Sequence, residues 1–410
     1  MFTSSTYLNF YMTIFTISAL IFLYYSNVNI KFDFIDYLVL AFFLLSIFST
    51  LINVKTLGYF LFFKSILNLR FVFFFFVIRN LLKFKFINLK TLALVTLIAS
   101  SFLSLDIIYQ HLYDHDLFGY KPFDGRYNGI FEDEAIAGGY IQKIFLISLI
   151  YLILSNINYK FIFITFFINL SGIGILLSLD RMPFLIYLFI LIILIIIIKK
   201  YRLIFLINFF ILILTFFLLF KNYDPINKRY YSLKNEIDFS KFLLFFEKDQ
   251  NQNTRPNPKN ENKLLIGDYS KIYKTAYYLW LEKPIIGSGA RSFNIECNKI
   301  PIEKKLTCST HPHNIYFEVL VNQGLLGLTI FIFFITLLIS NIFKTLSIKK
   351  NKNERIIILI LFTILISELW PLRTYGSIFQ SVNGTIFWFL ISLISSIKFI
   401  LKNNLSSLNR

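Results

Sequence analysis

The sequence predicts an all-α fold, a polytopic transmembrane bundle of about eleven or twelve spans with one large loop on one side. Apolar residues make up 56% of the 410 residues, and the mean hydropathy is +0.65. Uninterrupted apolar runs such as 184–198 recur along the chain. A bilayer core about 30 Å thick needs roughly 20 apolar residues per helix, so these runs are long enough to cross a membrane.

The formal net charge is +18, and its distribution indicates membrane topology rather than a nucleic-acid partner. Lysines and arginines concentrate in short links between apolar runs, as on the cytoplasmic side of an inner-membrane protein. With these links in the cytoplasm, the acidic segment 111–135 and the long loop 221–317 face the opposite side. The basic links lie at 79–90, 199–202, 344–355 and 398–410.

The spans are expected in two sets that the long loop separates. Residues 1–220 contain the N-terminal transmembrane helices with the outer loop 111–135, residues 221–317 form the large periplasmic loop, and residues 318–410 contain the C-terminal helices. The expected spans, in order, are 7–26, 34–52, 57–78, 90–109, 136–155, 161–179, 182–198, 203–220, 318–340, 355–371 and 378–400.

The run 57–78 is the least regular of these spans, because Lys64 and Arg70 lie inside it. Charges within a span are costly and usually face a cavity or a partner. Strict alternation of eleven spans also places the N-terminus outside, which is less usual. Either one span is missed before residue 79, or 57–78 makes two shorter passes.

The long loop has three recognisable parts. Its stretch 248–263 is polar and is expected to be flexible. The tyrosines and tryptophan of 269–281 predict an amphipathic helix at the membrane interface. Cys297 and Cys308 follow, and in an oxidising compartment they could form a disulfide; two unpaired thiols are the alternative.

The segment 311–327 closes this loop and holds two of the four histidines of the chain. His311 and His313 precede Asn314, and a Gly-Leu-Leu-Gly run leads from there into an apolar span. Histidine titrates near neutral pH, so it is suited to proton transfer. A zinc site is not expected, because the two histidines are closely spaced and no matching carboxylate or thiolate set accompanies them.

His313-Asn314, followed by nine residues and then Gly324-Leu-Leu-Gly327, resembles the motif of bacterial O-antigen ligases. The related O-antigen polymerases have similar sequences at this point. Three further segments resemble the same superfamily and occur in the expected order. They are Arg126-Tyr-Asn-Gly129 with Gly138 after it, Leu179-Asp180-Arg181, and Pro284-Ile-Ile-Gly287-Ser-Gly289-Ala-Arg291-Ser-Phe293.

The resemblance implies a membrane glycosyltransferase with a GT-C-like fold in the bacterial inner membrane. Such an enzyme moves a glycan from undecaprenyl diphosphate to an acceptor glycolipid, here lipid A-core, at the periplasmic face, with no cofactor and no metal. Arginine's planar fork matches phosphate oxygens, and histidine suits the base. The implied residues are His313 as the catalytic base, Arg126, Arg181, Arg291, His311 and Asn314 as substrate contacts, and Gly287, Gly289, Gly324 and Gly327 as structural motifs.

Two alternatives stay open. A polymerase would join lipid-linked repeat units and would differ from a ligase only in its acceptor; the near-complete His313 motif favours the ligase. A flippase for lipid-linked sugars would place its polar residues at the midplane of the membrane and often show repeat symmetry. The sequence departs from the superfamily's pattern at Asp180, where a small polar residue is expected before the arginine. If Asp180 pairs with Arg181, the phosphate binding expected of Arg181 would be weaker.

Overall fold

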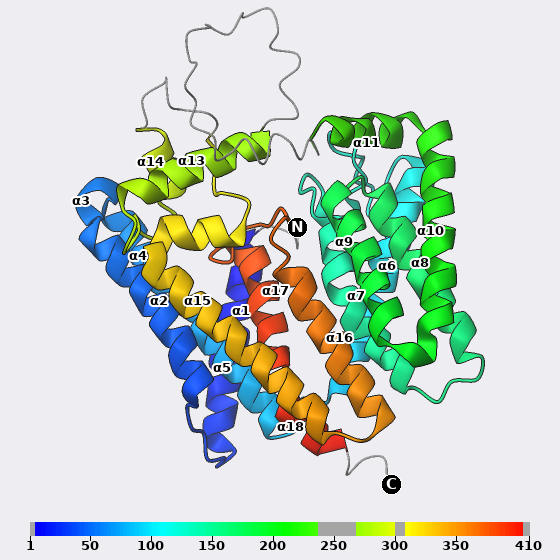
Figure 1. Ribbon diagram of the computed structural model, residues 1–410, viewed down its shortest axis with the longest axis horizontal. Coiled ribbons are helices and arrows are strands. Elements are labelled where there is room, and N and C mark those ends of the chain that lie inside the picture. The colour runs from blue at the N-terminus through cyan, green and yellow to red at the C-terminus, as the bar shows by residue number, and fades with distance from the viewer. Residues whose placement is uncertain (1–4, 237–267, 300–307, 405–410) are drawn as a thin grey trace, which may run out of the picture.

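The computed structural model describes residues 5–236, 268–299 and 308–404, and within these ranges it contains helices and no strand (Figure 1). The predicted all-α bundle is confirmed. Seven helical segments are long and apolar enough to cross a membrane, and the chain is a multi-pass membrane protein. The polar stretch expected at 248–263 lies outside the described residues.

The N-terminal part of the chain corrects the expectation about the run 57–78. This run is divided at Asn68 into two helices, which together make one candidate span from Tyr59 to Lys83. Among the described residues, this run is thus a single candidate span rather than two passes. The helices are α1 (Ser5–Tyr25), α2 (Phe34–Ile52), α3 (Val54–Leu57), α4 (Tyr59–Leu67) and α5 (Leu69–Lys83).

The alternation of spans then places the start of α1 at the same end of the bundle as the start of α17 (Ser381–Ser395). The hydroxyl of Thr385 donates to the sulfur of Met12 over 3.1 Å, which brings the N-terminal halves of the two helices together. The start of α1 therefore lies beside the start of α17 in the bundle.

Arg79 fixes the opposite end of α5 against the start of α2. Its guanidinium is 4% exposed and forms ion pairs with Asp33 and Asp36. Asp33 is also the N-cap of α2, where it forms a capping box with Asp36. The charge of this buried arginine is therefore paired with two carboxylates within the protein.

The middle of the chain forms a second group of helices (Figure 1). The outer segment between α6 and α7 folds onto the last turns of α6, because Asp106 accepts from the backbone of Leu117 and of Ile130, both over 3.0 Å. The helices are α6 (Leu89–Tyr113), α7 (Ala137–Leu154), α8 (Lys160–Leu177), α9 (Arg181–Ile197), α10 (Arg202–Asn222) and α11 (Asp224–Glu236), with 3-10 turns at Gly129–Phe131 and Lys199–Tyr201.

The C-terminal helices return to the N-terminal group, and each of the expected spans overlaps one helix or a run of consecutive helices. Two shorter helices, α13 and α14, lie across the end of the bundle at which α15 begins (Figure 1). The apolar core runs through the helices α7, α16 and α17. The bounds are α13 (Asp268–Glu282), α14 (Phe293–Cys297), α15 (Ile315–Ile348), α16 (Lys352–Glu368), α17 (Ser381–Ser395) and α18 (Ile397–Asn404).

Candidate functional site

The glycines expected in two separate motifs meet in one backbone junction. Helix α15 is interrupted at Gly324, which has φ 64° and ψ −160°. A Cβ on Gly324 would collide with the backbone of Ile285, and a Cβ on Gly287 would lie 2.5 Å from the backbone nitrogen of Gln323. Only glycine fits these two positions, because the backbone angle and the space both exclude a side chain.

Backbone hydrogen bonds close this junction. Non-helical backbone within a membrane helix is tolerated where the protein itself satisfies the freed polar groups. The segment 284–289 does so by pairing with α15 on both sides of the break. The bonds run from the nitrogen of Ser288 to the oxygen of Val321 (2.8 Å), Gly289 to Asn322 (2.9 Å), Leu325 to Pro284 (2.8 Å) and Leu326 to Ile285 (3.2 Å).

The end of α2 holds the junction from the other side. The hydroxyl of Ser49 donates to the carbonyl of Asn322 over 2.9 Å, and the backbone nitrogen of Ala290 donates to the hydroxyl of Thr50 over 2.8 Å. Both hydroxyls are buried. The backbone immediately before Arg291 is therefore fixed to two helices.

Asn314 caps the start of α15 and anchors the segment that carries the histidines. Its side-chain oxygen accepts from the backbone nitrogens of Tyr316 and Phe317 at 3.0 and 3.3 Å. Its side-chain nitrogen donates to the carbonyl of Pro371 over 2.7 Å. In the structure this amide acts on the protein's own backbone, which ties α15 to the 369–380 loop that joins α16 to α17.

Tyr375, in the 369–380 loop, binds both histidine residues through its backbone. Its nitrogen donates to the carbonyl of His313 over 2.8 Å, and its carbonyl accepts from Nε2 of His311 over 3.2 Å. Its buried hydroxyl donates to the carboxylate of Glu368. One loop residue thus links the histidine segment to the core.

The two histidine rings, whose centroids are 4.1 Å apart, differ in chemical state. A carbonyl can only accept, so Nε2 of His311 carries the hydrogen. Burial, and then the nearby ring of His313, lowers the pKa of His311 to about 4. Burial also lowers the pKa of His313, so this ring is mainly neutral at neutral pH.

His313 keeps a ring nitrogen available. Its Nε2 lies 2.9 Å from the hydroxyl of Ser309, while its Nδ1 has no hydrogen-bond partner among the residues that the structure describes. The ring is only partly buried, and the ring of Tyr269 from α13 packs edge-on against it at 5.4 Å. A neutral imidazole with an open nitrogen can accept a proton.

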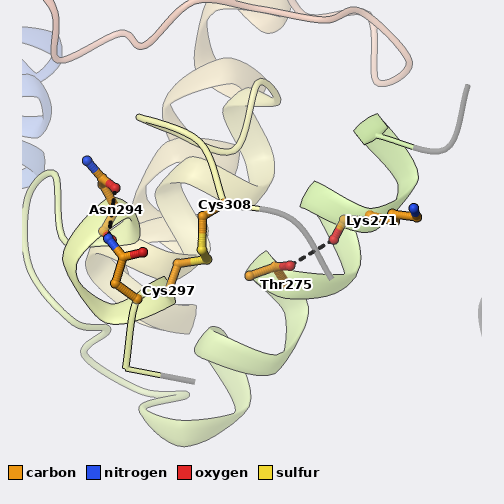
Figure 2. Close-up of a disulfide and its surroundings, with 6 residues drawn as sticks. Lys271, Thr275, Asn294, Cys297 and Cys308 are labelled. Atoms are coloured by element: carbon orange, nitrogen blue, oxygen red, sulfur yellow. Dashed lines mark hydrogen bonds between the residues drawn. A yellow bond between two sulfur atoms is a disulfide. The ribbon is translucent and has the colours of Figure 1, made fainter. Parts of the chain in front are cut away.

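A disulfide between Cys297 and Cys308 attaches the chain before Ser309 to α14, beside α13 (Figure 2). Both cysteines belong to a small apolar cluster that also includes Phe293 and Val321. This cluster joins α13 and α14 to the first turns of α15. The residues next to His313 are therefore held from two sides, by the disulfide and by the 369–380 loop.

Arg291 reaches the same region from the glycine junction. Its guanidinium donates to the carbonyl of Phe379 over 2.8 Å, and its Nε is buried with no hydrogen-bond partner in the part of the chain that the structure describes. Burial lowers the pKa of Arg291, and the charge of Glu318 opposes that effect. Glu318, in the first turn of α15, itself accepts from the backbone nitrogen of Ile378 over 3.1 Å.

Arg126 and Arg181 form a second group near the starts of α7 and α9. Arg126 lies 3.7 Å from the carboxylate of Asp180, and Arg181 donates to the carbonyl of Arg229 over 3.4 Å. The sequence raised a pair between Asp180 and Arg181; in the structure Asp180 pairs with Arg126, and its other oxygen accepts from the backbone nitrogen of Gly138 over 3.1 Å. Burial raises the pKa of Asp180 to about 6.

A buried polar chain connects the two groups. Arg373 of the 369–380 loop donates to Glu368 over 2.9 Å and to Gln142 of α7 over 2.7 Å. Gln142 follows Gly138 by four residues, so both lie on one face of α7. Helix α7 thus binds Asp180 with one turn and the loop that holds His313 with the next.

These positions can be set against known families. Residues 164–332 match the family model described as O-antigen ligase. The predicted resemblance to the O-antigen ligase superfamily is confirmed. No entry among the curated proteins matches the sequence.

The O-antigen ligase match covers less than half of the chain, but it includes much of the candidate site. It contains Arg181, Arg291 and His313 together with the glycines of the junction, and it ends shortly after Gly327. Arg126 and the 369–380 loop lie outside the matched residues. Among the described residues, no group of three or more His, Cys, Asp or Glu side chains is placed to hold a metal ion.

Sequence reasoning on the ligase motif missed the partners of its residues. Tyr375 and Glu368 lie more than fifty residues after His313, in a stretch without a recognisable pattern. Glu318 was the more accessible signal, since a carboxylate at the very start of an apolar span is costly unless it has a partner.

Proposed function

We propose that this protein is a membrane glycosyltransferase of the O-antigen ligase type. In this reaction it moves a glycan from undecaprenyl diphosphate to a sugar hydroxyl of lipid A-core. The observation that carries the proposal is His313, a neutral and partly exposed imidazole that lies within the residues matching the ligase family. Arg291, held by the glycine junction, is the cation of the same region.

In the proposed step, His313 takes the proton of the acceptor hydroxyl while its oxygen bonds to the anomeric carbon of the glycan. The bond between that carbon and the diphosphate oxygen breaks, and the diphosphate leaves with the electron pair. A general base must be unprotonated to act, and burial favours that form of His313 by lowering its pKa.

The leaving diphosphate requires positive charge. Arg291, Arg126 and Arg181 are the proposed cations, and the planar fork of arginine matches phosphate oxygens. Asp180 reduces the charge that Arg126 offers, since the two lie 3.7 Å apart. We therefore expect Arg291 to contribute more than Arg126.

The outer face of the inner membrane is the proposed location of the site. The disulfide between Cys297 and Cys308 supports this location, because such bonds persist in the oxidising periplasm. The basic links at the opposite ends of the spans support the same orientation.

The test replaces His313 by alanine. We expect glycan transfer to fall by roughly 10²- to 10⁴-fold, because that is the usual contribution of a general base. His115→Ala is the matched control, since His115 is exposed and lies in a different outer segment. Full transfer by His313→Ala, with normal amounts in the membrane, would exclude the assignment.

Deletion of the gene followed by a gel of surface polysaccharide identifies the acceptor. Unmodified lipid A-core together with accumulated undecaprenyl-linked chains indicates the ligase. A product with a single repeat indicates the polymerase, in which the acceptor is a second lipid-linked repeat. An unchanged ladder would contradict both.

A further inference from the structure

Arg70 is a half-buried cation whose side chain has no partner within the described protein. It is the second residue of α5, directly after the break at Asn68. Among the residues that the structure describes, its guanidinium forms neither a hydrogen bond nor an ion pair, and its Nε is buried. Its one contact of note is the ring of the adjacent Phe71, 4.9 Å away.

The contrast with Arg79 on the same helix is informative. Arg79 is held by two carboxylates, Asp33 and Asp36, at the other end of α5. A buried arginine is normally paired in this way, because an unpaired charge in a membrane protein is costly. The missing partner of Arg70 is therefore expected to be an anion from outside the chain.

Arg70 and Arg291 lie in the same region of the protein. Phe71, the residue after Arg70, packs with Phe43, and Phe43 packs with Phe379 at ring distances of 6.2 and 5.9 Å. Arg291 donates to the carbonyl of that same Phe379. The two guanidinium groups are close enough for their charges to repel each other.

The charges of this region do not balance. Arg70 and Arg291 contribute two positive charges, while Glu318 is the acidic group whose charge acts on Arg291. That carboxylate also accepts from the backbone nitrogen of Ile378. The Nε atoms of both arginines are buried without hydrogen-bond partners among the described residues. A doubly charged anion with several oxygens would satisfy both groups.

We propose that Arg70 and Arg291 together bind the phosphate groups of a lipid-linked diphosphate. This inference rests on the proposed transfer reaction and adds Arg70, from the third expected span, to its donor site. Arg70 acts here as a binding residue for the donor, at the outer end of α5 where the diphosphate of a membrane-bound lipid would lie.

The experiment measures binding of undecaprenyl diphosphate to the purified protein in nanodiscs, without any transfer step. We expect Arg70→Gln to weaken this binding at least roughly tenfold, since removing one partner of a desolvated charge pair has an effect of that size. Arg70→Lys keeps the charge and should retain part of the affinity. Lys64→Gln is the matched control, because Lys64 lies in the same candidate span and rests on the ring of Phe60.

Two results would overturn the proposal. One is unchanged affinity in Arg70→Gln when its melting temperature matches that of the wild type. The other is that Arg70→Gln loses as much affinity for phosphatidylglycerol nanodiscs as for undecaprenyl diphosphate. That result would assign Arg70 to phospholipid headgroups rather than a diphosphate. Inorganic pyrophosphate, as a competitor, should displace the lipid from the wild type.

The binding assay separates this inference from the proposed function. Wild-type protein that binds undecaprenyl diphosphate through Arg70 but transfers no glycan would contradict the transfer reaction alone. Wild-type transfer that Arg70→Gln leaves unchanged, together with unchanged binding, would contradict the role of Arg70 alone.

Discussion

His311 and His313 stand two residues apart, yet their rings can do different things. The Nε2 hydrogen of His311 is committed to the carbonyl of Tyr375, and its pKa of about 4 keeps the ring neutral. His313 has an open Nδ1 among the described residues, and its pKa is lowered only by burial. We therefore assign proton transfer to His313 and support of the segment to His311.

This difference predicts the pH dependence of transfer. A base must be unprotonated, so activity should fall as the pH drops through the pKa of His313 and should be constant above it. Because burial lowers that pKa, the midpoint should lie below the ordinary histidine value of 6.5. The measurement is kcat/KM between pH 5 and 8 with a fixed donor lipid. A midpoint above 6.5 would contradict the assignment.

His311 predicts a separate effect on stability. The folded protein keeps this ring neutral down to a pKa of about 4, whereas the unfolded chain takes up a proton near 6.5. Between these values the unfolded state binds more protons, so stability should fall as the pH falls from 6.5 to about 4. Thermal unfolding of wild type and His311→Gln across this window measures it, and the variant should lose part of the slope.

At the residue scale, the sequence identifies which side chains are chemically unusual but not their partners. His313 is conspicuous because histidine is scarce and its motif is specific. The pair of Arg126 with Asp180 was not predictable, since it depends on how the start of α7, through the backbone of Gly138, holds the carboxylate.

At the scale of elements, α15 is two helical pieces joined by a strained residue. Its first piece carries the cap at Asn314 and the carboxylate of Glu318, and its second is the membrane span. The backbone of 284–289 fills the break and binds both pieces. The Gly-x-Gly and Gly-x-x-Gly patterns are therefore two halves of one junction.

We expect Gly324→Ala to destabilise the protein by roughly 1 to 3 kcal/mol or more, because its backbone angles suit glycine alone and the added carbon meets the backbone of Ile285. Gly139→Ala is the matched control, since Gly139 lies in a regular helix and its nearest neighbour would be 3.8 Å away. The midpoint of thermal unfolding in detergent compares the two. Equal effects would rule out the junction as the cause.

The disulfide between Cys297 and Cys308 also acts at the scale of elements, on the helices α13 and α14. Replacing both Cys297 and Cys308 by serine should destabilise the α13–α14 unit by about 3 kcal/mol, the value for closing a loop of this size. Hydrogen exchange should rise in α13 and α14 while α8 keeps its protection. Uniform exchange throughout the protein would show that the bond stabilises no separate unit.

The spans themselves were predictable, because apolar length is a local property of the chain. The break at Asn68 and the break at Gly324 were not, because each depends on packing between distant segments. The break at Gly324 exists only because residues 284–289 supply hydrogen bonds from some forty residues upstream. Periodicity within one run cannot reveal such a partner.

At the scale of the whole molecule, the 369–380 loop holds two groups of helices together. Tyr375 binds the histidine segment, and Arg373 binds Gln142 of α7. Because α7 also binds Asp180, the arginines near α9 and the histidines near α15 are kept in a fixed relation. Activity should therefore depend on buried residues that touch no substrate.

Tyr375→Phe removes the hydroxyl that donates to Glu368 and keeps the ring. We expect kcat to fall by up to roughly 10²-fold with little change in KM, since small displacements of a catalytic group have effects of that order. Asp36→Asn is the control, because it weakens a buried ion pair with Arg79 at the opposite end of the bundle. It should lower the melting temperature without lowering kcat. Equal kcat values for the two variants would show that the 369–380 loop has no positioning role.

The break in α15 also determines where the candidate site lies relative to the hydrocarbon layer of the membrane. The helical piece after Gly324 runs to Ile348, and at 1.5 Å per residue it is about 36 Å long, enough to cross a hydrocarbon layer of about 30 Å by itself. The turns before Gly324 are therefore not needed to reach the far side. Changes in bilayer thickness can be absorbed by tilting of the lower piece, while the upper piece stays at the level of the headgroups.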